Sequence, residues 1–219
     1  MTEALAISTA LERRHPISDQ LFDRLFPSSQ RIRSAFHWTP IDIALRACAL
    51  LAPLPDTKVL DVGAGVGKLC LVGALTTRGR WFGIERDADM VRAALAAARR
   101  LGVEQRASFA IADVSTVEWT AFDAFYLFNP FAEGLFRSEP DALTRREIYV
   151  SNIERVHRGL EGTRPGTRVV TYHGFGGDSH LDGFELVHRE QARDDALCLW
   201  VRRDPGPYRP RARRPTSAP

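Results

Sequence analysis

Three glycines follow an aspartate in the stretch DVGAGVGK, residues 61–68, at a spacing typical of ligand-binding loops. Gly63, Gly65 and Gly67 occupy alternate positions. Because glycine has no Cβ, the backbone of such a loop can approach a bound molecule closely. Asp61 places a negative charge just before the loop, where it attracts cations and opposes the binding of a phosphate to the next helix. The pattern therefore predicts a ligand that carries positive charge.

A dinucleotide is the alternative ligand for a glycine loop, and the spacing argues against it. The dinucleotide fingerprint GxGxxG, started at Gly63, needs glycine at position 68, where the chain has Lys68. S-adenosylmethionine carries an ammonium and a sulfonium group, and Asp61 would attract both. We therefore expect S-adenosylmethionine as the cofactor. A nicotinamide-dependent oxidoreductase is the alternative enzyme class, and a cofactor-binding scaffold without turnover is the non-enzymatic one.

The loop lies within an alternation of strand and helix patterns. Five apolar stretches are predicted to be strands, at residues 58–62, 80–85, 108–113, 122–129 and 167–173. Helical patterns occur at residues 39–52, 69–77, 87–102 and 141–160. The later stretches FELVHRE and ALCLWVRR are expected to pair antiparallel. This order predicts an α/β fold, a Rossmann-like three-layer sandwich with a mostly parallel seven-stranded sheet and an antiparallel C-terminal strand pair.

The composition divides the chain into three parts. Residues 1–38 are expected to form an N-terminal helical segment, and residues 39–203 a single S-adenosylmethionine-binding domain. Residues 204–219 are expected to form a disordered basic tail. From Arg202 onward the chain holds six arginines and one aspartate, so its net charge of +3 comes from this end. The rest of the chain is slightly acidic, which does not favour a nucleic-acid partner.

Polar residues stand at the ends of the predicted strands. Glu85 ends the second strand, Asp113 the third, and Phe128-Asn129-Pro130-Phe131 the fourth. In an open α/β sheet the parallel strands end at one edge, and ligands bind there. In order and spacing, these residues and VLDVGAGVGK resemble the class I S-adenosylmethionine-dependent methyltransferases, over roughly residues 38–175.

The resemblance implies a role for each residue. Glu85 would bind the two ribose hydroxyls through paired hydrogen bonds, and Asp113 would lie near the adenine amino group. The helix that starts at Thr39 would approach the methionine end of the cofactor. The cofactor-binding residues implied in this way are Thr39, Asp61, Gly63, Ala64, Gly65, Gly67, Glu85, Arg86, Asp113, Val114 and Asn129.

Each of these residues also has a purely structural interpretation. Asp61 could cap the following turn, and Glu85 could be a solvated acid at a strand end. Asp113 could form an Asx turn, a common role for aspartate. Thr39 could be the N-cap of an ordinary packing helix, with Asp42 completing a capping box. The joint spacing favours the cofactor interpretation over these alternatives.

The segment after the fourth strand is predicted to orient the methyl acceptor. Methyl transfer from a sulfonium is an in-line displacement, so the protein mainly holds donor and acceptor in line. The Asn129 side-chain oxygen could accept a hydrogen bond from an acceptor N–H, and the Pro130 carbonyl could accept a second. Phe131 could line the acceptor pocket or contact a cationic amine. These three residues are the predicted catalytic residues, and nitrogen is the favoured acceptor atom.

Two subfamilies resemble the chain at this segment. Methyltransferases that act on adenine amines or glutamine amides carry (D/N)PP(Y/F), whereas here Phe131 replaces the second proline. Dot1-like lysine methyltransferases carry Asn-Asn-Phe-Ala, which Asn129-Pro130-Phe131-Ala132 partly matches. A protein side chain or a small molecule is therefore the favoured acceptor, with nucleic acid possible. A simple strand-ending turn is the alternative interpretation of Asn129-Pro130.

A few further residues are weaker candidates. Tyr172, His173 and His180 lie in or beside the glycine-rich stretch YHGFGGDSH, and a histidine there could act as a base. Glu133 could pair with a cationic acceptor. A plain glycine-rich loop and a solvated acid are the alternatives.

The remaining composition indicates an ordinary globular protein. Cys48, Cys70 and Cys198 are far apart and lie in apolar segments, so we expect buried free thiols and no metal site. The first thirty residues lack the apolar core of a signal peptide, and no stretch is apolar enough for a membrane span. These features predict a cytoplasmic protein without a membrane partner, and they leave the oligomeric state open.

Overall fold

The computed structural model describes residues 2–31, 38–131, 141–175 and 181–204. Its seven strands form one sheet in the order β3-β2-β1-β4-β5-β7-β6. Neighbouring strands are parallel from β3 to β5, whereas β7 is antiparallel to both β5 and β6. The strands are β1 (Lys58–Val62), β2 (Arg80–Glu85), β3 (Ala107–Ile111), β4 (Ala124–Phe128), β5 (Arg168–Tyr172), β6 (Phe184–Ala192) and β7 (Asp195–Arg202). The predicted Rossmann-like sandwich with its antiparallel C-terminal pair is therefore confirmed.

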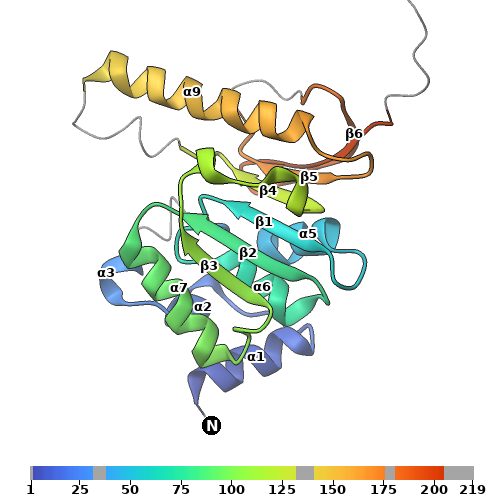
Figure 1. The fold of residues 1–219 in the computed structure, drawn as a ribbon. Helices are drawn as coiled ribbons and strands as arrows, with labels where there is room; N and C mark the ends of the chain where they lie inside the picture. The colour runs from blue at the N-terminus through green and yellow to red at the C-terminus, as the bar shows by residue number, and fades with distance from the viewer. Residues whose placement is uncertain (1, 32–37, 132–140, 176–180, 205–219) are drawn as a thin grey trace, which may run out of the picture.

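Helices cover both faces of the sheet (Figure 1). One face carries the helices of the first half of the chain, and the other carries the long helix α9 and two short 3₁₀ turns. The described helices are α1 (Glu3–Glu12), α2 (Asp19–Asp23), α3 (Ser28–Arg31), α5 (Ile41–Leu51), α6 (Lys68–Thr76), α7 (Ala88–Leu101) and α9 (Ala142–Glu161), and the 3₁₀ turns are η1 (Val114–Thr116) and η2 (Trp119–Ala121). None of the described helices has the length and apolar character needed to cross a membrane.

The side-chain alternation of the strands produces two separate core clusters. Val59 of β1 points into the cluster under α5, α6 and α7, whereas Leu60 points into the cluster under α9. The same alternation holds in β4, where Tyr126 and Phe125 face opposite sides. Asp61, two residues after Val59 and opposite Tyr126 in the ladder, therefore faces the side of α5 and α6.

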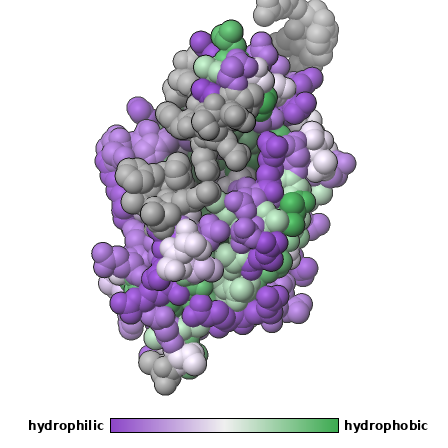
Figure 2. Space-filling model, turned by 90° about the vertical axis from the view of Figure 1, so that its left-hand side faces the viewer, coloured by the Kyte–Doolittle hydropathy of each residue, from purple (hydrophilic) through white to green (hydrophobic). Residues whose placement is uncertain are grey.

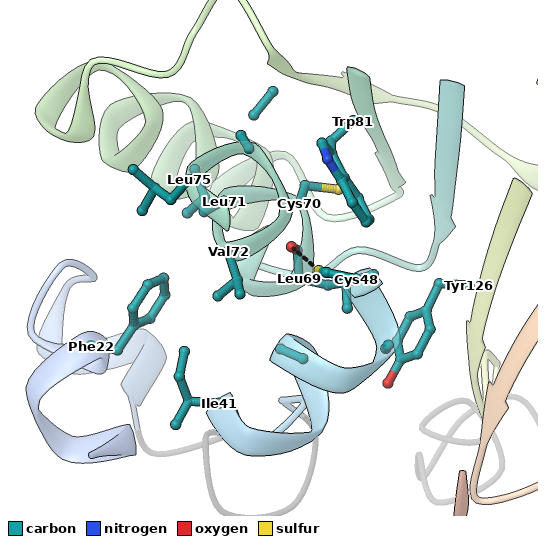
Figure 3. Close-up of a cluster of buried hydrophobic side chains, with 14 of the residues drawn as sticks. Phe22, Ile41, Cys48, Leu69, Cys70, Leu71, Val72, Leu75, Trp81 and Tyr126 are labelled. Atoms are coloured by element: carbon teal, nitrogen blue, oxygen red, sulfur yellow. Dashed lines mark hydrogen bonds between the residues drawn. The ribbon is translucent and has the colours of Figure 1, made fainter. Parts of the chain in front are cut away.

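The N-terminal helices pack into the first of these clusters. Ile7, Leu11 and Phe22 are fully buried there (Phe22 in Figure 3), on the same side of the sheet as α5 and α6. Ser18 caps α2 through a hydrogen bond from the Leu21 N–H group, as the sequence predicted. The segment before residue 39 thus shares its core with the rest of the fold.

Lys68 fixes this N-terminal segment to the glycine loop. It is the first residue of α6, and its side chain is almost fully buried. Its ammonium lies 2.6 Å from Asp19 and 2.9 Å from Asp23, both on α2, and over the ring of Phe22. A charge this deep is tolerated because it is paired and hydrogen-bonded. Lys68, which replaces the third glycine of the dinucleotide fingerprint, therefore holds α2 against the start of α6.

Several predicted boundaries need correction. Thr39 does not cap α5, because Pro40 is the N-cap residue and makes no side-chain cap bond. The third strand ends at Ile111, two residues before Asp113. By contrast, α7 has the predicted Asp87 N-cap, and Gly102 closes it in the left-handed conformation.

Candidate active site

The candidate site residues gather at the edge where the parallel strands end. The arrowheads of β2 and β3 point to the left in Figure 1, and Figure 2 looks onto that side, where the described surface is mostly hydrophilic. The order of the sheet changes direction between β1 and β4 at this edge. A ligand of an open α/β sheet binds at this position.

The glycine loop is held in a shape that side chains would disturb. Gly63, Gly65 and Gly67 all have positive φ, at 77°, 54° and 77°. A Cβ on Gly67 would lie 2.3 Å from the Phe109 ring, so this glycine serves the packing of α6 against β3. The Gly63 and Ala64 N–H groups donate to the Ile84 carbonyl, which ties the loop to β2. Gly63, which is exposed, and Gly65, which is partly exposed, remain available to a ligand.

Asp61 is a buried carboxylate next to this loop. It is 5% exposed, and the one hydrogen bond that its carboxylate accepts among the described residues is a long one, from the Cys70 Sγ at 3.9 Å. Burial and the nearby charge of Glu85 raise the pKa of Asp61 to about 7. Its surroundings are Cys48, Cys70 and Tyr126, whose pKa values are themselves raised by burial.

This environment fits a cationic ligand. A buried carboxylate without a cationic partner is unfavourable, and a bound positive group would remove that cost. Lys68, at the end of the glycine loop, is held by Asp19 and Asp23 instead. The ammonium and sulfonium of S-adenosylmethionine are groups of the required charge, so the donor set of this edge fits that cofactor.

Glu85 clamps the loop to the end of β2. Its Oε2 accepts the Gly65 N–H at 3.1 Å, and its Oε1 accepts the N–H groups of Arg86 and Asp87 at 2.7 and 3.0 Å. The carboxylate is thus fixed beside Gly65, at the carboxyl end of β2. Three of its roughly four acceptor positions are already in use.

Asp113 lies farther along the same edge, and its side chain has two tasks. Its Oδ1 accepts the Ser115 N–H at 2.9 Å and so caps η1, which is the Asx-type role weighed for it. Its Oδ2 lies 3.6 Å from the Arg86 Nε, and the Ser115 backbone bond helps to lower the Asp113 pKa. The Val114 side chain is buried in the core, which leaves its backbone to meet a ligand.

The segment after β4 lies directly against the glycine loop. A Cβ added to Gly63 would lie 3.7 Å from the Pro130 Cβ, so the two segments are neighbours with room for little more than a methyl group between them at this point. Asn129 has φ 37° and Phe131 has φ 76°, values that side-chain-bearing residues rarely adopt. Such outliers cluster at functional sites, where surrounding structure maintains them.

Thr39 lies near this edge but is engaged with the core. Its hydroxyl is 3.1 Å from the Tyr126 hydroxyl, and both residues are buried. Tyr126 is opposite Asp61 across the β1–β4 ladder. Thr39 therefore contributes to the wall behind Asp61.

The end of β5 contributes Tyr172 and His173. The Phe128 ring lies 5.3 Å from both of their rings. Glu133 and His180, the other two weaker candidates, lie outside the described residues.

Sequence reasoning missed the partners of these residues. Tyr126, Cys48 and Cys70 surround Asp61 from three different elements. His173 is faced by Asp194, in the β6–β7 turn, and by Asp195, the first residue of β7. Alternation along β4 could have placed Tyr126 beside Asp61. The contact between residue 173 and the β6–β7 turn follows only from the antiparallel register.

Comparison with known proteins shows similarity to methyltransferases. Residues 54–159 match the family described as "Methyltransferase domain". The chain is 34% identical over 166 residues to the 23S rRNA (uracil(1939)-C(5))-methyltransferase RlmD of Burkholderia cenocepacia. The alignment covers 66% of this chain and 36% of that protein. A similar match is found with RlmD of Burkholderia lata. The chain thus spans about a third of the length of these relatives.

Solved structures show the same fold. An RNA methyltransferase from Salinibacter ruber in complex with S-adenosyl-L-homocysteine aligns with TM-score 0.55 and 22% identity, over 77% of this chain and 95% of that one. TrmN from Thermus thermophilus aligns with TM-score 0.60 and 20% identity, over 83% of this chain and 53% of that one.

Proposed function

We propose that this chain, which belongs to the class I S-adenosylmethionine-dependent methyltransferases through residues 54–159, methylates a nitrogen atom of an RNA base. One observation carries the proposal. The buried Asp61, which lacks a cationic partner among the described residues, precedes a glycine loop whose Gly63 is a neighbour of Pro130, in the positive-φ segment that begins at Asn129. This proximity brings a site for a cationic donor next to a hydrogen-bonding group suited to an acceptor.

The residues after β4 favour nitrogen as the acceptor atom. S-adenosylmethionine supplies an activated methyl group, so the acceptor must present a lone pair in line with it. The Asn129 side chain is partly exposed and can accept a hydrogen bond from an N–H of an amine or amide. That bond would turn the remaining lone pair of the nitrogen toward the donor.

The cysteines argue against methylation of a pyrimidine carbon. A ring carbon has no lone pair, and making it nucleophilic requires addition of a group such as a thiolate. Cys48, Cys70 and Cys198 are all buried, and burial raises the pKa of each thiol. The carbon specificity in the names of the RlmD relatives is therefore not proposed for this chain.

The relatives favour RNA as the acceptor class. Several of them are named as enzymes that methylate 23S rRNA, and one structural neighbour is named as an RNA methyltransferase. The sequence analysis favoured a protein side chain or a small molecule, and the comparisons do not support that preference. The nicotinamide alternative is inconsistent with the family match.

A cationic amine is a second candidate acceptor because of the acids near the end of β5. The Asp194 side chain is largely exposed, and that of Asp195 is partly exposed. The pKa of Asp194 is lowered, with hydrogen bonds from its own backbone N–H and from the Tyr172 hydroxyl among the causes. These charges would attract a lysine side chain or a small amine and repel a phosphate group.

A labelling experiment separates these acceptors. The purified chain is incubated with S-adenosylmethionine tritiated on the methyl group and with total RNA, protein or small molecules from cells that lack its gene. We expect label in RNA. Label only in protein or small molecules would contradict the RNA assignment, and label in none would support a binding scaffold.

Two variants test the division of the site. We expect Asp61→Ala to abolish donor binding in calorimetry. Asn129→Ala should retain donor affinity within about twofold while losing about 10²-fold or more in turnover, the typical effect of removing one orienting group. Equal loss of binding in both would show that Asn129 does not act on the acceptor.

A further inference from the structure

His173 directly follows β5, as Asn129 directly follows the adjacent strand β4. Phe128 and Tyr172 are register partners in the β4–β5 ladder, so Asn129 and His173 are the next residues on adjacent parallel strands. The His173 ring lies 5.3 Å from the Phe128 ring at an angle of 30°. The imidazole therefore stacks on the residue that directly precedes Asn129.

A fixed carboxylate orients this imidazole. Asp195 Oδ2 lies 3.0 Å from His173 Nδ1. The other oxygen, Asp195 Oδ1, accepts the Ala196 N–H at 2.6 Å, which holds the carboxylate in place. A carboxylate at Nδ1 favours the proton on that nitrogen and leaves Nε2 as the basic site. The arrangement of base and orienting acid recurs in general-base catalysis.

The other charged groups around the ring leave Nε2 free of a hydrogen bond within the described part of the chain. Asp194 Oδ1 is 3.8 Å from Nε2, which is too long for one, and it accepts the Tyr172 hydroxyl at 3.1 Å. Arg193, from the same turn, points away to Asp19 and Asp42. The ring is thus bordered by two carboxylates, and Nε2 makes no hydrogen bond to the described residues.

The backbone at this position is also unusual. His173 has φ 60°, and Asn129 on the adjacent strand has φ 37°. Neither residue is a glycine, so both depend on their surroundings to hold this conformation. The His173 side chain is 31% exposed, enough to pass a proton to water.

We propose that His173, oriented by Asp195, removes the proton from the nitrogen that is methylated, an inference that rests on the proposed function. The nitrogen lone pair forms the new N–C bond as the S–C bond of the donor breaks, and the sulfur retains that electron pair. The N–H proton passes to His173 Nε2 and then to water. His173 is thus a catalytic residue, and Asp195 is a positioning residue that acts through it.

Three variants test this inference on the fraction of extract that accepts label from the wild type. We expect His173→Gln to lower kcat about 10²-fold and to leave the dissociation constant of S-adenosylmethionine within twofold. The rise of kcat with pH should disappear in His173→Gln and shift in Asp195→Asn. His188→Gln is the matched control, because His188 is also a histidine near an acid, 3.9 Å from Glu190 Oε2, but on the outer strand β6.

A second measurement does not depend on the acceptor. Nitrogen-15 NMR of the neutral His173 ring should show the proton on Nδ1 in the wild type, and Asp195→Asn should lose that preference. A proton on Nε2 in the wild type, or an unchanged pH profile in His173→Gln, would overturn the inference. Label that enters protein and not RNA would contradict the proposed acceptor and leave these two readouts to decide the role of His173.

Discussion

The two halves of the carboxyl-end edge are built in different ways. The donor half, at the ends of β1 to β3, is held by backbone hydrogen bonds and by glycines such as Gly67 that admit no Cβ. The acceptor half, at the ends of β4 and β5, is held by side-chain contacts with the β6–β7 turn. Its positive-φ residues include Asn129, Phe131 and His173, which are not glycines. The glycines of the donor half form a pattern that is recognisable in the sequence, whereas the contacts of the acceptor half join residues far apart in the chain.

The largest expected effect is at Gly67. In Gly67→Ala the new methyl group would overlap the Phe109 ring and would also impose a side chain on φ 77°. We expect a loss of about 4 kcal/mol in the free energy of unfolding, measured by urea denaturation. The control is Gly102→Ala, where φ is 69° but nothing lies within 4 Å of the added atom, and the expected loss is about 1 kcal/mol. Equal losses would show that packing around the donor loop is not restrictive.

Lys68 gives the next largest effect. Lys68→Met leaves Asp19 and Asp23 without their buried partner, so we expect about 3 kcal/mol of destabilisation. Arg80→Met is the control, since its pair with Asp56 is exposed and is worth less than about 0.5 kcal/mol. If the two variants were equally stable, the N-terminal helices would not be anchored to the donor half through Lys68.

Asp61 should make stability depend on pH. Its pKa is raised from 3.8 unfolded to about 7 folded, so the folded state holds the proton more tightly. The contribution of Asp61 protonation to the free energy of unfolding is therefore fully present at low pH and is lost as pH rises through about 7. The free energy of unfolding of Asp61→Asn, measured by urea denaturation, should rise relative to that of the wild type as pH increases. We expect this difference to change by about 2 kcal/mol between about pH 5 and pH 8. A constant difference across that range would show that Asp61 is not protonated in the free protein.

The smallest effect on stability is expected in the acceptor half. Asn129 is partly exposed, so Asn129→Ala should cost about 1 kcal/mol, mainly from placing alanine at a positive φ. Thermal denaturation measures this change. A loss as large as that of Gly67→Ala would mean that both halves are equally restricted and would remove the contrast between them.

The difference between the donor half and the acceptor half explains which parts of the site the sequence could predict. The β1 strand, the glycine loop and α7 with its caps follow from local patterns, because each is specified within about fifteen residues. The interpretation of Lys68 and Thr39 did not follow, because their partners Asp23 and Tyr126 lie 45 and 87 residues away. Asp195 beside His173 is a similar case. The sequence thus predicts the elements at the ends of β1 to β3 from local patterns. It also names Asn129–Phe131 and His173 as candidates, but it does not predict the side-chain contacts that hold the ends of β4 and β5.

Calorimetry of S-adenosylmethionine binding near pH 7, in two buffers that differ in ionisation enthalpy, tests the role of Asp61 most directly. The wild type should release a proton on binding, because the donor's positive charge favours the ionised carboxylate. Asp61→Asn should release none and bind at least about 10²-fold more weakly, as expected for the loss of a buried charge pair. Wild-type affinity in Asp61→Asn, or the same proton release in both proteins, would contradict the assignment.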